Sequence, residues 1–199
     1  MKNIIFDLGG VILKDEPITF LKKLNIDDNT YNQLKIFFDD WNKLDLGEES
    51  LEDKYNKCNF PIEYDNLYKD KLIYYYKYRE IDIRLIECIN KLKENGYNVY
   101  VISDNNKECS LYYKNNPSFN NIDGWVMSCD YHTTKDIGNI FAIFINKFNL
   151  KPEECFFIDN NAINIKVANK HGIIGSVFNT NDDINRLYDD MKNNNINTK

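Results

Sequence analysis

The fold of this chain is decided near its start by the stretch Ile4-Ile5-Phe6-Asp7-Leu8-Gly9-Gly10-Val11-Ile12-Leu13. The apolar β-forming residues before Asp7 predict a buried strand, and the glycine pair after it allows a tight turn. Asp7 is therefore expected at the carboxyl end of a central strand, where open α/β sheets bind ligands. A carboxylate there can be a nucleophile or a metal ligand, or it can simply cap a turn. On this stretch alone the two interpretations weigh about equally.

Composition places the chain among ordinary globular proteins. It has 199 residues, of which 43% are hydrophobic and 28% charged, enough for one core domain with a sizeable insertion. The net charge of −6, with scattered acidic residues, disfavours nucleic acid as a partner, because nucleic-acid binding needs a basic face. With no apolar stretch of membrane-spanning length and no signal peptide, we expect a cytoplasmic protein that is not associated with a membrane.

The five cysteines point to the same compartment. They are odd in number and no two have a CxxC spacing, so we expect free thiols in a reducing cytoplasm. A zinc site is not expected, because His132 and His171 lie near no cysteine pair.

The hydrophobic pattern divides the chain into two parts. Residues 15–80 have helical spacing and no clear strand, which predicts a small helical domain that includes helices beginning at Pro17 and after Ser50. From residue 81 onward, apolar strands at 97–102, 125–127, 155–158 and 173–178 alternate with helices at 83–92, 137–148 and 161–170. This alternation predicts an α/β fold, a Rossmann-like parallel sheet with helices on both faces. The expected core domain comprises residues 1–14 and 81–199.

Four polar residues are expected to converge at one edge of this sheet. Asp7, Ser103 and Asp159 each end a predicted strand, and Lys135 opens the helix that contains Ile137. All strands of a parallel sheet present their carboxyl ends at the same edge. Each residue alone is weak evidence, since Lys135 could be a solvated surface lysine and Ser103 a helix cap.

The chemistry of this set fits phosphoryl transfer. Asp7 can attack phosphorus and form an aspartyl-phosphate. Mg²⁺ prefers carboxylate and carbonyl oxygens together with substrate phosphate, so Asp7, Asp159 and the backbone carbonyl of Gly9 are candidate ligands. Ser103 and the backbone after it, at Asp104, can donate hydrogen bonds to phosphoryl oxygens. Lys135 would place a positive charge between nucleophile and phosphate.

The chain resembles the haloacid dehalogenase-like hydrolase superfamily, and the resemblance covers nearly all of its length. The matching segments are Phe6-Asp7-Leu8-Gly9-Gly10-Val11, Val101-Ile102-Ser103-Asp104-Asn105, Ser128-Cys129-Asp130 through Lys135, and Phe156-Phe157-Ile158-Asp159-Asn160 through Ile165. Residues 15–80 take the position of that family's small α-helical cap, inserted after the first strand. The form of the first motif, and Gly47-Glu48-Glu49-Ser50, look most like the sugar-phosphate phosphatase subgroup that includes the glucose-1-phosphate phosphatases.

The resemblance implies Asp7 as nucleophile, Ser103 as phosphate binder, Lys135 as charge anchor and Asp159 as magnesium ligand. Three positions depart from the superfamily pattern. Gly9 stands where its phosphatases usually carry a second Asp as general acid and base, although the subgroup also has Gly there. Asn160 replaces a frequent second acid after Asp159, and Asp136 follows Lys135 where Pro is usual.

The leading hypothesis is a Mg²⁺-dependent phosphatase that hydrolyses a small phosphorylated metabolite, with sugar phosphates as the subgroup's substrates, through an aspartyl-phosphate intermediate. The departures motivate an alternative, a catalytically weak binding or regulatory protein. A metal-independent haloacid dehalogenase is a third, less favoured hypothesis, because Asp159 is placed where it suits a metal.

Overall fold

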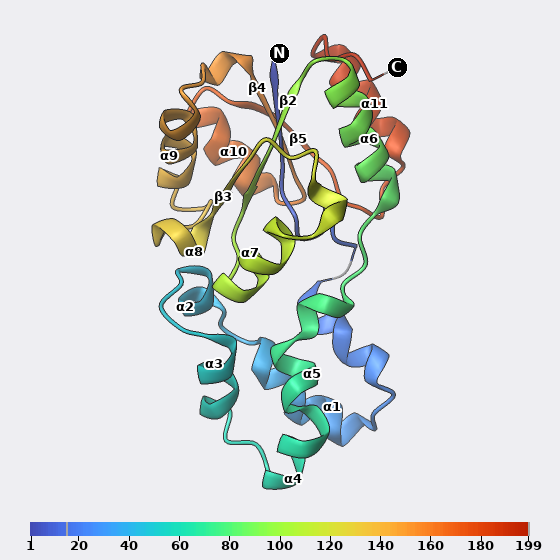
Figure 1. Cartoon of the computed structure of the whole chain (residues 1–199), viewed down its shortest axis with the longest axis vertical. Helices are drawn as coiled ribbons and strands as arrows, with labels where there is room; N and C mark the ends of the chain where they lie inside the picture. The colour runs from blue at the N-terminus through green and yellow to red at the C-terminus, as the bar shows by residue number, and fades with distance from the viewer. Residues whose placement is uncertain (15, 199) are drawn as a thin grey trace.

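The computed structural model describes residues 1–14 and 16–198 and contains one five-stranded parallel sheet with the strand order β3-β2-β1-β4-β5 (Figure 1). The strands are β1 (Asn3–Phe6), β2 (Asn98–Ser103), β3 (Gly124–Met127), β4 (Cys155–Asp159) and β5 (Ile174–Val177). The helices of the sheet domain are α6 (Ile83–Glu94), α7 (Lys107–Lys114), α8 (Ser128–Tyr131), α9 (Asn139–Phe148), α10 (Ala162–Lys170) and α11 (Ile184–Asn193). The predicted α/β fold is thus confirmed.

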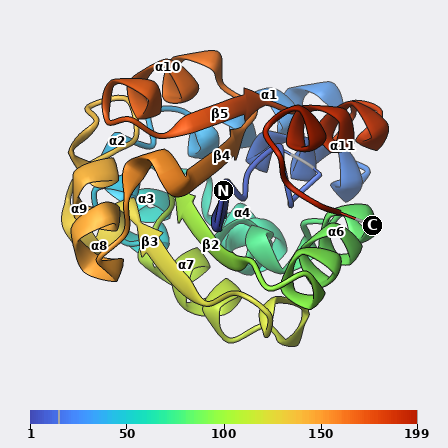
Figure 2. The ribbon, with the colours of Figure 1, turned by 90° about the horizontal axis from the view of Figure 1, so that it is seen from above.

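β1 lies at the centre of the sheet because it is apolar on both faces. Its side chains alternate between two hydrophobic clusters, as the two-residue period of a strand requires. Ile5 packs with residues of α9 and α10, whereas Ile4 and Phe6 belong to the cluster that includes residues of α6 and α11. Seen from above, the two helix pairs lie on opposite sides of the sheet (Figure 2). Parallel sheets that are buried in this way on both faces consist of continuous apolar strands.

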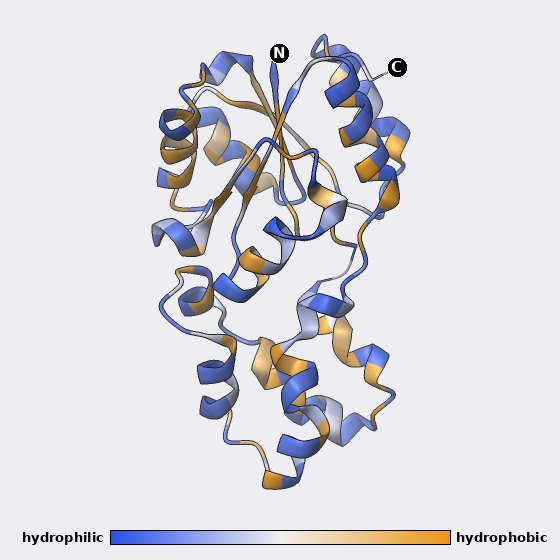
Figure 3. Cartoon of the chain, in the orientation of Figure 1, coloured by the Kyte–Doolittle hydropathy of each residue, from blue (hydrophilic) through white to orange (hydrophobic). Residues whose placement is uncertain are grey.

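The chain between β1 and α6 forms short helices, which lie next to the carboxyl ends of the strands (Figure 1). They are α1 (Asp28–Leu34), α2 (Asn42–Asp45), α3 (Leu51–Lys57), α4 (Ile62–Tyr64) and α5 (Asp70–Ile73), interspersed with 3-10 and π turns. Apolar and hydrophilic residues are mixed along these helices (Figure 3); Leu34 and Leu72 are buried, whereas Ile62 is exposed. Stacked and edge-to-face aromatic rings, such as those of Phe38, Trp41 and Tyr75, pack against one another in this segment.

Two short connections join the helical segment to the sheet. Leu13 pairs with Ile81 in an antiparallel bridge, and the backbone N–H of Asp82 donates to the carbonyl of Ile12 at 2.8 Å. The buried Asp82 carboxylate also accepts hydrogen bonds from Arg84 and from the Thr180 hydroxyl. The return connection is therefore fastened to the loop that precedes α11.

Several local expectations need correction. The helix predicted from Ile137 begins at Asn139, and Ile137 is 61% exposed, so Lys135 lies in the preceding turn and opens no helix. The helix that begins at Pro17 is a 3-10 helix, and α11 was not predicted. The expected start of the helical domain at residue 15 lies outside the described residues.

Candidate active site

Lys135 brings two of the predicted strand ends together. Its ammonium Nζ lies 2.8 Å from Oδ1 of Asp7, directly after β1, and 2.7 Å from Oδ2 of Asp159, at the end of β4. All three side chains are buried. Because β1 and β4 are neighbours in a parallel pair, the sheet itself sets the separation of the two carboxylates that the ammonium bridges.

The turn that carries Lys135 is held by Asp104. The Asp104 carboxylate accepts the backbone N–H of Lys135 at 3.0 and 3.3 Å, and the Thr134 hydroxyl donates to Asp136. The Asp104 main chain was predicted to bind phosphate, and the contacts of its side chain to the Lys135 backbone leave that prediction open. Ser103, at the end of β2, is buried beside Asp104.

Asp159 is surrounded by hydrogen-bond donors. Besides Lys135, its carboxylate accepts the backbone N–H of Asn161 at 2.7 Å and the side-chain amide of Asn164 at 3.1 Å. These donors come from the start of α10, where negative charge is favoured. Asn160, the residue after Asp159, lies on the wall of the adjoining cavity.

Buried charge strongly perturbs this cluster. Burial and the neighbouring carboxylates Asp159 and Asp104 raise the pKa of Asp7 to about 7, against the opposing effect of the Lys135 ammonium. Burial alone would lower the pKa of Lys135, but its carboxylate neighbours outweigh burial and hold that pKa above its ordinary value. Lys135 therefore stays charged. Strongly perturbed carboxyl groups in a cleft are typical of functional sites.

The cluster opens into a cavity of about 610 Å³ between the sheet and the helical segment. Asp7, Ser103 and Lys135 form its floor, and this volume is in the range usual for small-molecule sites. The helical segment contributes both aromatic and charged side chains to the wall. These are Phe38, Asp40, Trp41, Asp45, Tyr75 and Arg79.

Asp45 and Arg79 were not found by sequence reasoning. Burial, Asp104 and Asp7 raise the pKa of Asp45 to about 7, although Lys135 opposes them. A Cβ atom built on Gly9 would lie 3.7 Å from the Arg79 guanidinium, so Arg79 lies beside the position that the superfamily's second Asp would occupy. Neither residue belongs to a recognisable motif, and only the fold brings them to the nucleophile.

The donor set suits a magnesium ion. The carboxyl groups of Asp7, Asp45, Asp104 and Asp159 outnumber the Lys135 ammonium that they surround. Within residues 1–14 and 16–198, no group of three or more His, Cys, Asp or Glu side chains is arranged to hold a metal. Mg²⁺ is usually bound by one or two carboxylates together with other oxygen ligands and substrate phosphate, and Asp7 and Gly9 both line the cavity.

Comparison with known proteins identifies a hydrolase family and a related phosphatase. A family model described as haloacid dehalogenase-like hydrolase matches residues 1–172. The chain is 27% identical over 192 residues to the D-ribitol-5-phosphate phosphatase of Bacteroides thetaiotaomicron, with 86% of this chain and 89% of the relative covered.

Solved structures share the fold. A HAD family enzyme of Bacteroides thetaiotaomicron, crystallised with magnesium and inorganic phosphate, superposes with a TM-score of 0.71 at 23% identity, over 94% of this chain and 99% of that one. L-2-haloacid dehalogenase from Xanthobacter autotrophicus superposes with a TM-score of 0.65 at 12% identity, over 88% and 76% of the two chains. In the described part of the present chain, no helix is both long and apolar enough to cross a membrane.

Proposed function

The chain belongs to the haloacid dehalogenase-like hydrolase family, and we propose that it is a magnesium-dependent phosphatase that acts on a small phosphorylated metabolite. The observation that carries the proposal is the bridge of Lys135 between Asp7 and the fully buried Asp159, because Asp7 and Lys135 both line the cavity. A charged lysine beside a buried carboxylate allows a dianionic phosphate to approach that carboxylate.

Each site residue has a role in this reaction. Asp7 attacks phosphorus and forms an aspartyl-phosphate, while Lys135 offsets the negative charge between nucleophile and phosphate. Ser103 and the main chain at Asp104 donate hydrogen bonds to the phosphoryl oxygens. Water then hydrolyses the aspartyl-phosphate, which restores Asp7 and releases inorganic phosphate.

Asp7, the backbone carbonyl of Gly9 and Asp159 would hold Mg²⁺, and Asn160 after Asp159 would be a further oxygen ligand. When bound, the ion would screen the negative charges that the carboxylates and the phosphate bring together. The relative crystallised with magnesium and phosphate supports this choice of metal.

The cavity wall supports a polyol or sugar phosphate as the substrate class. The stacked rings of Phe38 and Trp41 give an apolar face, and Asp40, Asp45 and Arg79 give charged hydrogen-bonding groups on the same wall. Such a mixed wall fits a hydroxylated carbon chain. The 27% identity to a D-ribitol-5-phosphate phosphatase supports the same class.

We also propose that residues 15–80 form a cap domain over a core of residues 1–14 and 81–199. In support, side chains of this segment line the cavity that Asp7 also lines, and its helices lie next to the carboxyl ends of the strands (Figure 1). Such a cover would exclude water and determine which substrates fit. The protein is proposed to act in the cytoplasm.

The proposal is tested with Asp7→Asn. Wild-type protein should hydrolyse phosphate esters with Mg²⁺ and lose activity in EDTA, and Asp7→Asn should abolish turnover while the circular dichroism spectrum is unchanged. Ribitol 5-phosphate, glucose 1-phosphate and p-nitrophenyl phosphate serve as substrates, with L-2-chloropropionate to detect dehalogenation. Phosphatase activity that survives in Asp7→Asn would overturn the proposed nucleophile. Wild-type protein that is inactive on every phosphate ester would support the catalytically weak alternative.

A further inference from the structure

Gly9 leaves the nucleophile loop without a proton donor. A phosphate ester of an alcohol releases an alkoxide, and a positioned acid accelerates that release by about 10²- to 10⁴-fold. A carboxyl group able to reach the leaving oxygen has to line the cavity. In the helical segment Glu16, Asp40 and Asp45 do so, and Glu16 lies against Gly10 of the nucleophile loop.

We infer that Asp45, supplied by the helical segment, is the general acid and base of this active site. The inference rests on the proposed phosphatase function and assigns a step that Gly9 cannot perform. Asp45 lines the same cavity as Asp7 and lies within electrostatic range of Asp7, Asp104 and Lys135. Asp45 is the last residue of α2, which belongs to the helical segment next to the carboxyl ends of the strands (Figure 1).

Three consecutive residues fix the backbone at Asp45 to the sheet domain. The Ser128 hydroxyl donates to the Asp45 carbonyl at 2.6 Å and accepts the backbone N–H of Asn105 at 2.9 Å. The carbonyl of the next residue, Leu46, pairs with His132 Nδ1 at 2.6 Å. Gly47 packs so closely that a Cβ atom would lie 2.4 Å from the Cys129 carbonyl oxygen. A catalytic group needs this kind of support.

The Asp45 carboxyl group is itself available. The contacts described above engage only the backbone of residues 45–47. Within the described part of the chain, the side-chain carboxyl group of Asp45 makes no hydrogen bond or ion pair. The Asp45 side chain is half-buried and its neighbours are mainly acidic. These surroundings raise the pKa of Asp45, so a large share of its carboxyl group is protonated near neutral pH. The charged groups around it are Asp7, Asp104 and Lys135 from the sheet edge and Glu16, Asp40 and Arg79 on the cavity wall. The titratable side chain of His132 lies beside Leu46, and Lys107 lies beside Gly47.

The two half-reactions balance around this proton. As Asp7 Oδ bonds to phosphorus and the bond from phosphorus to the leaving oxygen breaks, the Asp45 proton moves to that oxygen and an alcohol leaves. A water then attacks the aspartyl-phosphate and gives its proton to the Asp45 carboxylate. The bond from phosphorus to Asp7 breaks, inorganic phosphate leaves, and Asp45 is again protonated.

The test is Asp45→Asn, which keeps the size of the side chain and the backbone contacts. p-Nitrophenyl phosphate needs no proton on its leaving group, whereas ribitol 5-phosphate and glycerol 3-phosphate do. We expect the variant to release one p-nitrophenolate per active site in a rapid burst and then to turn over slowly, with phosphorylated Asp7 accumulating after acid quench. Turnover of the alkyl phosphates should fall by about 10²-fold or more.

The matched control is Asp70→Asn, which removes an exposed carboxylate of α5 that does not line the cavity and should leave the dependence of rate on leaving-group pKa as in wild type. An Asp45→Asn variant that loses the aryl burst and alkyl turnover by the same factor, or loses neither, would overturn the role of Asp45. A burst that persists in Asp45→Asn shows that Asp7 still reacts, so the acid is tested separately from the phosphatase function. If the wild-type protein forms no phosphoenzyme at all, both the proposed phosphatase function and the proposed role of Asp45 are wrong.

Discussion

At the scale of single residues, Lys135 decides whether the carboxylates of the site can stay charged. We expect Lys135→Gln to lower the free energy of unfolding by about 3–5 kcal/mol in Mg²⁺-free buffer, because it leaves Asp7 and Asp159 buried without a counter-ion. Urea unfolding measures this, and the loss should be larger at pH 8 than at pH 6, where unpaired carboxyl groups can take up protons. Lys114→Gln is the control, since its ion pair with Asp130 is at the surface and is worth about 0–1 kcal/mol. Equal losses would contradict the assignment.

Because of Asp45, the free energy of unfolding should fall as the pH rises. Its folded-state pKa of about 7 lies above the unfolded value of about 3.9. The native state therefore holds the proton more tightly, and stability is lost as pH rises from about 4 to about 7. In Mg²⁺-free buffer, Asp45→Asn should match wild type near pH 4 and be more stable by about 1–2 kcal/mol at pH 8, after allowance for solvent screening. A difference that does not change with pH would show that Asp45 titrates normally.

The sequence predicts some of these residues and not others for a physical reason. Asp7, Ser103 and Asp159 end apolar strands, and strand ends are visible in the hydrophobic pattern. Asp45 and Arg79 lie on short helices and turns, where nothing local distinguishes them from surface charges. Their position depends on how the helical segment folds back over the sheet.

At the scale of elements, Gly47 allows α2 to approach α8. It has φ of +69°, and an added Cβ would collide with the Cys129 carbonyl oxygen. We expect Gly47→Ala to destabilise the fold and to lower kcat, because Asp45 is displaced together with its backbone. Gly96→Ala is the matched control, since Gly96 has φ of +82° but open space around it. Gly96→Ala should cost only the backbone strain of about 1–2 kcal/mol and should leave kcat unchanged. Loss of kcat in both variants would contradict this account.

Most long elements were predictable because their patterns are strong. Ser50 and Asp53 form the capping box that begins α3, and the apolar strands lie within a residue or two of their expected ends. The helix expected from Ile137 starts late because Gly138 adopts φ of +94° and interrupts it. The expectations also missed the α-helix α11, and the helix expected at Pro17 is a 3-10 helix, a form that has no distinct hydrophobic period.

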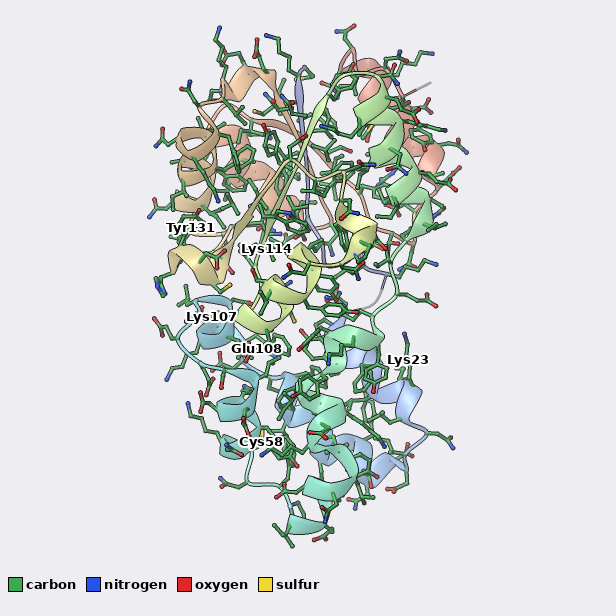
Figure 4. All side chains as sticks on the ribbon, viewed as in Figure 1. Lys23, Cys58, Lys107, Glu108, Lys114 and Tyr131 are labelled. Carbon is green, nitrogen blue, oxygen red and sulfur yellow. The ribbon has the colours of Figure 1, made fainter. Side chains whose placement is uncertain are left out.

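At the scale of the whole molecule, the helical segment is attached by two connections and by contacts to α7 and α8. Leu51 N–H donates to Glu108 Oε1 at 2.9 Å, and Tyr113 donates to the Tyr76 carbonyl at 3.0 Å. Figure 4 shows Glu108 at this boundary. Because the two parts share one continuous hydrophobic cluster, we expect them to unfold together while the boundary itself opens locally.

Hydrogen exchange of the intact chain tests this expectation. Amides of β1 and β4 should be protected most strongly, and those of residues 42–51 should exchange sooner. Mg²⁺ with orthovanadate should slow exchange at residues 42–51 and 103–109, because a ligand in the cavity contacts both sides of the boundary.

Ser128→Ala removes the hydroxyl that joins Asp45 to Asn105, so it should speed exchange at residues 42–47 and lower turnover of alkyl phosphates. Ser118→Ala, on the exposed turn after α7, should change neither. Uniform protection of all helices by the ligand, or faster exchange in the sheet of Ser128→Ala, would show that the boundary does not open separately from the core.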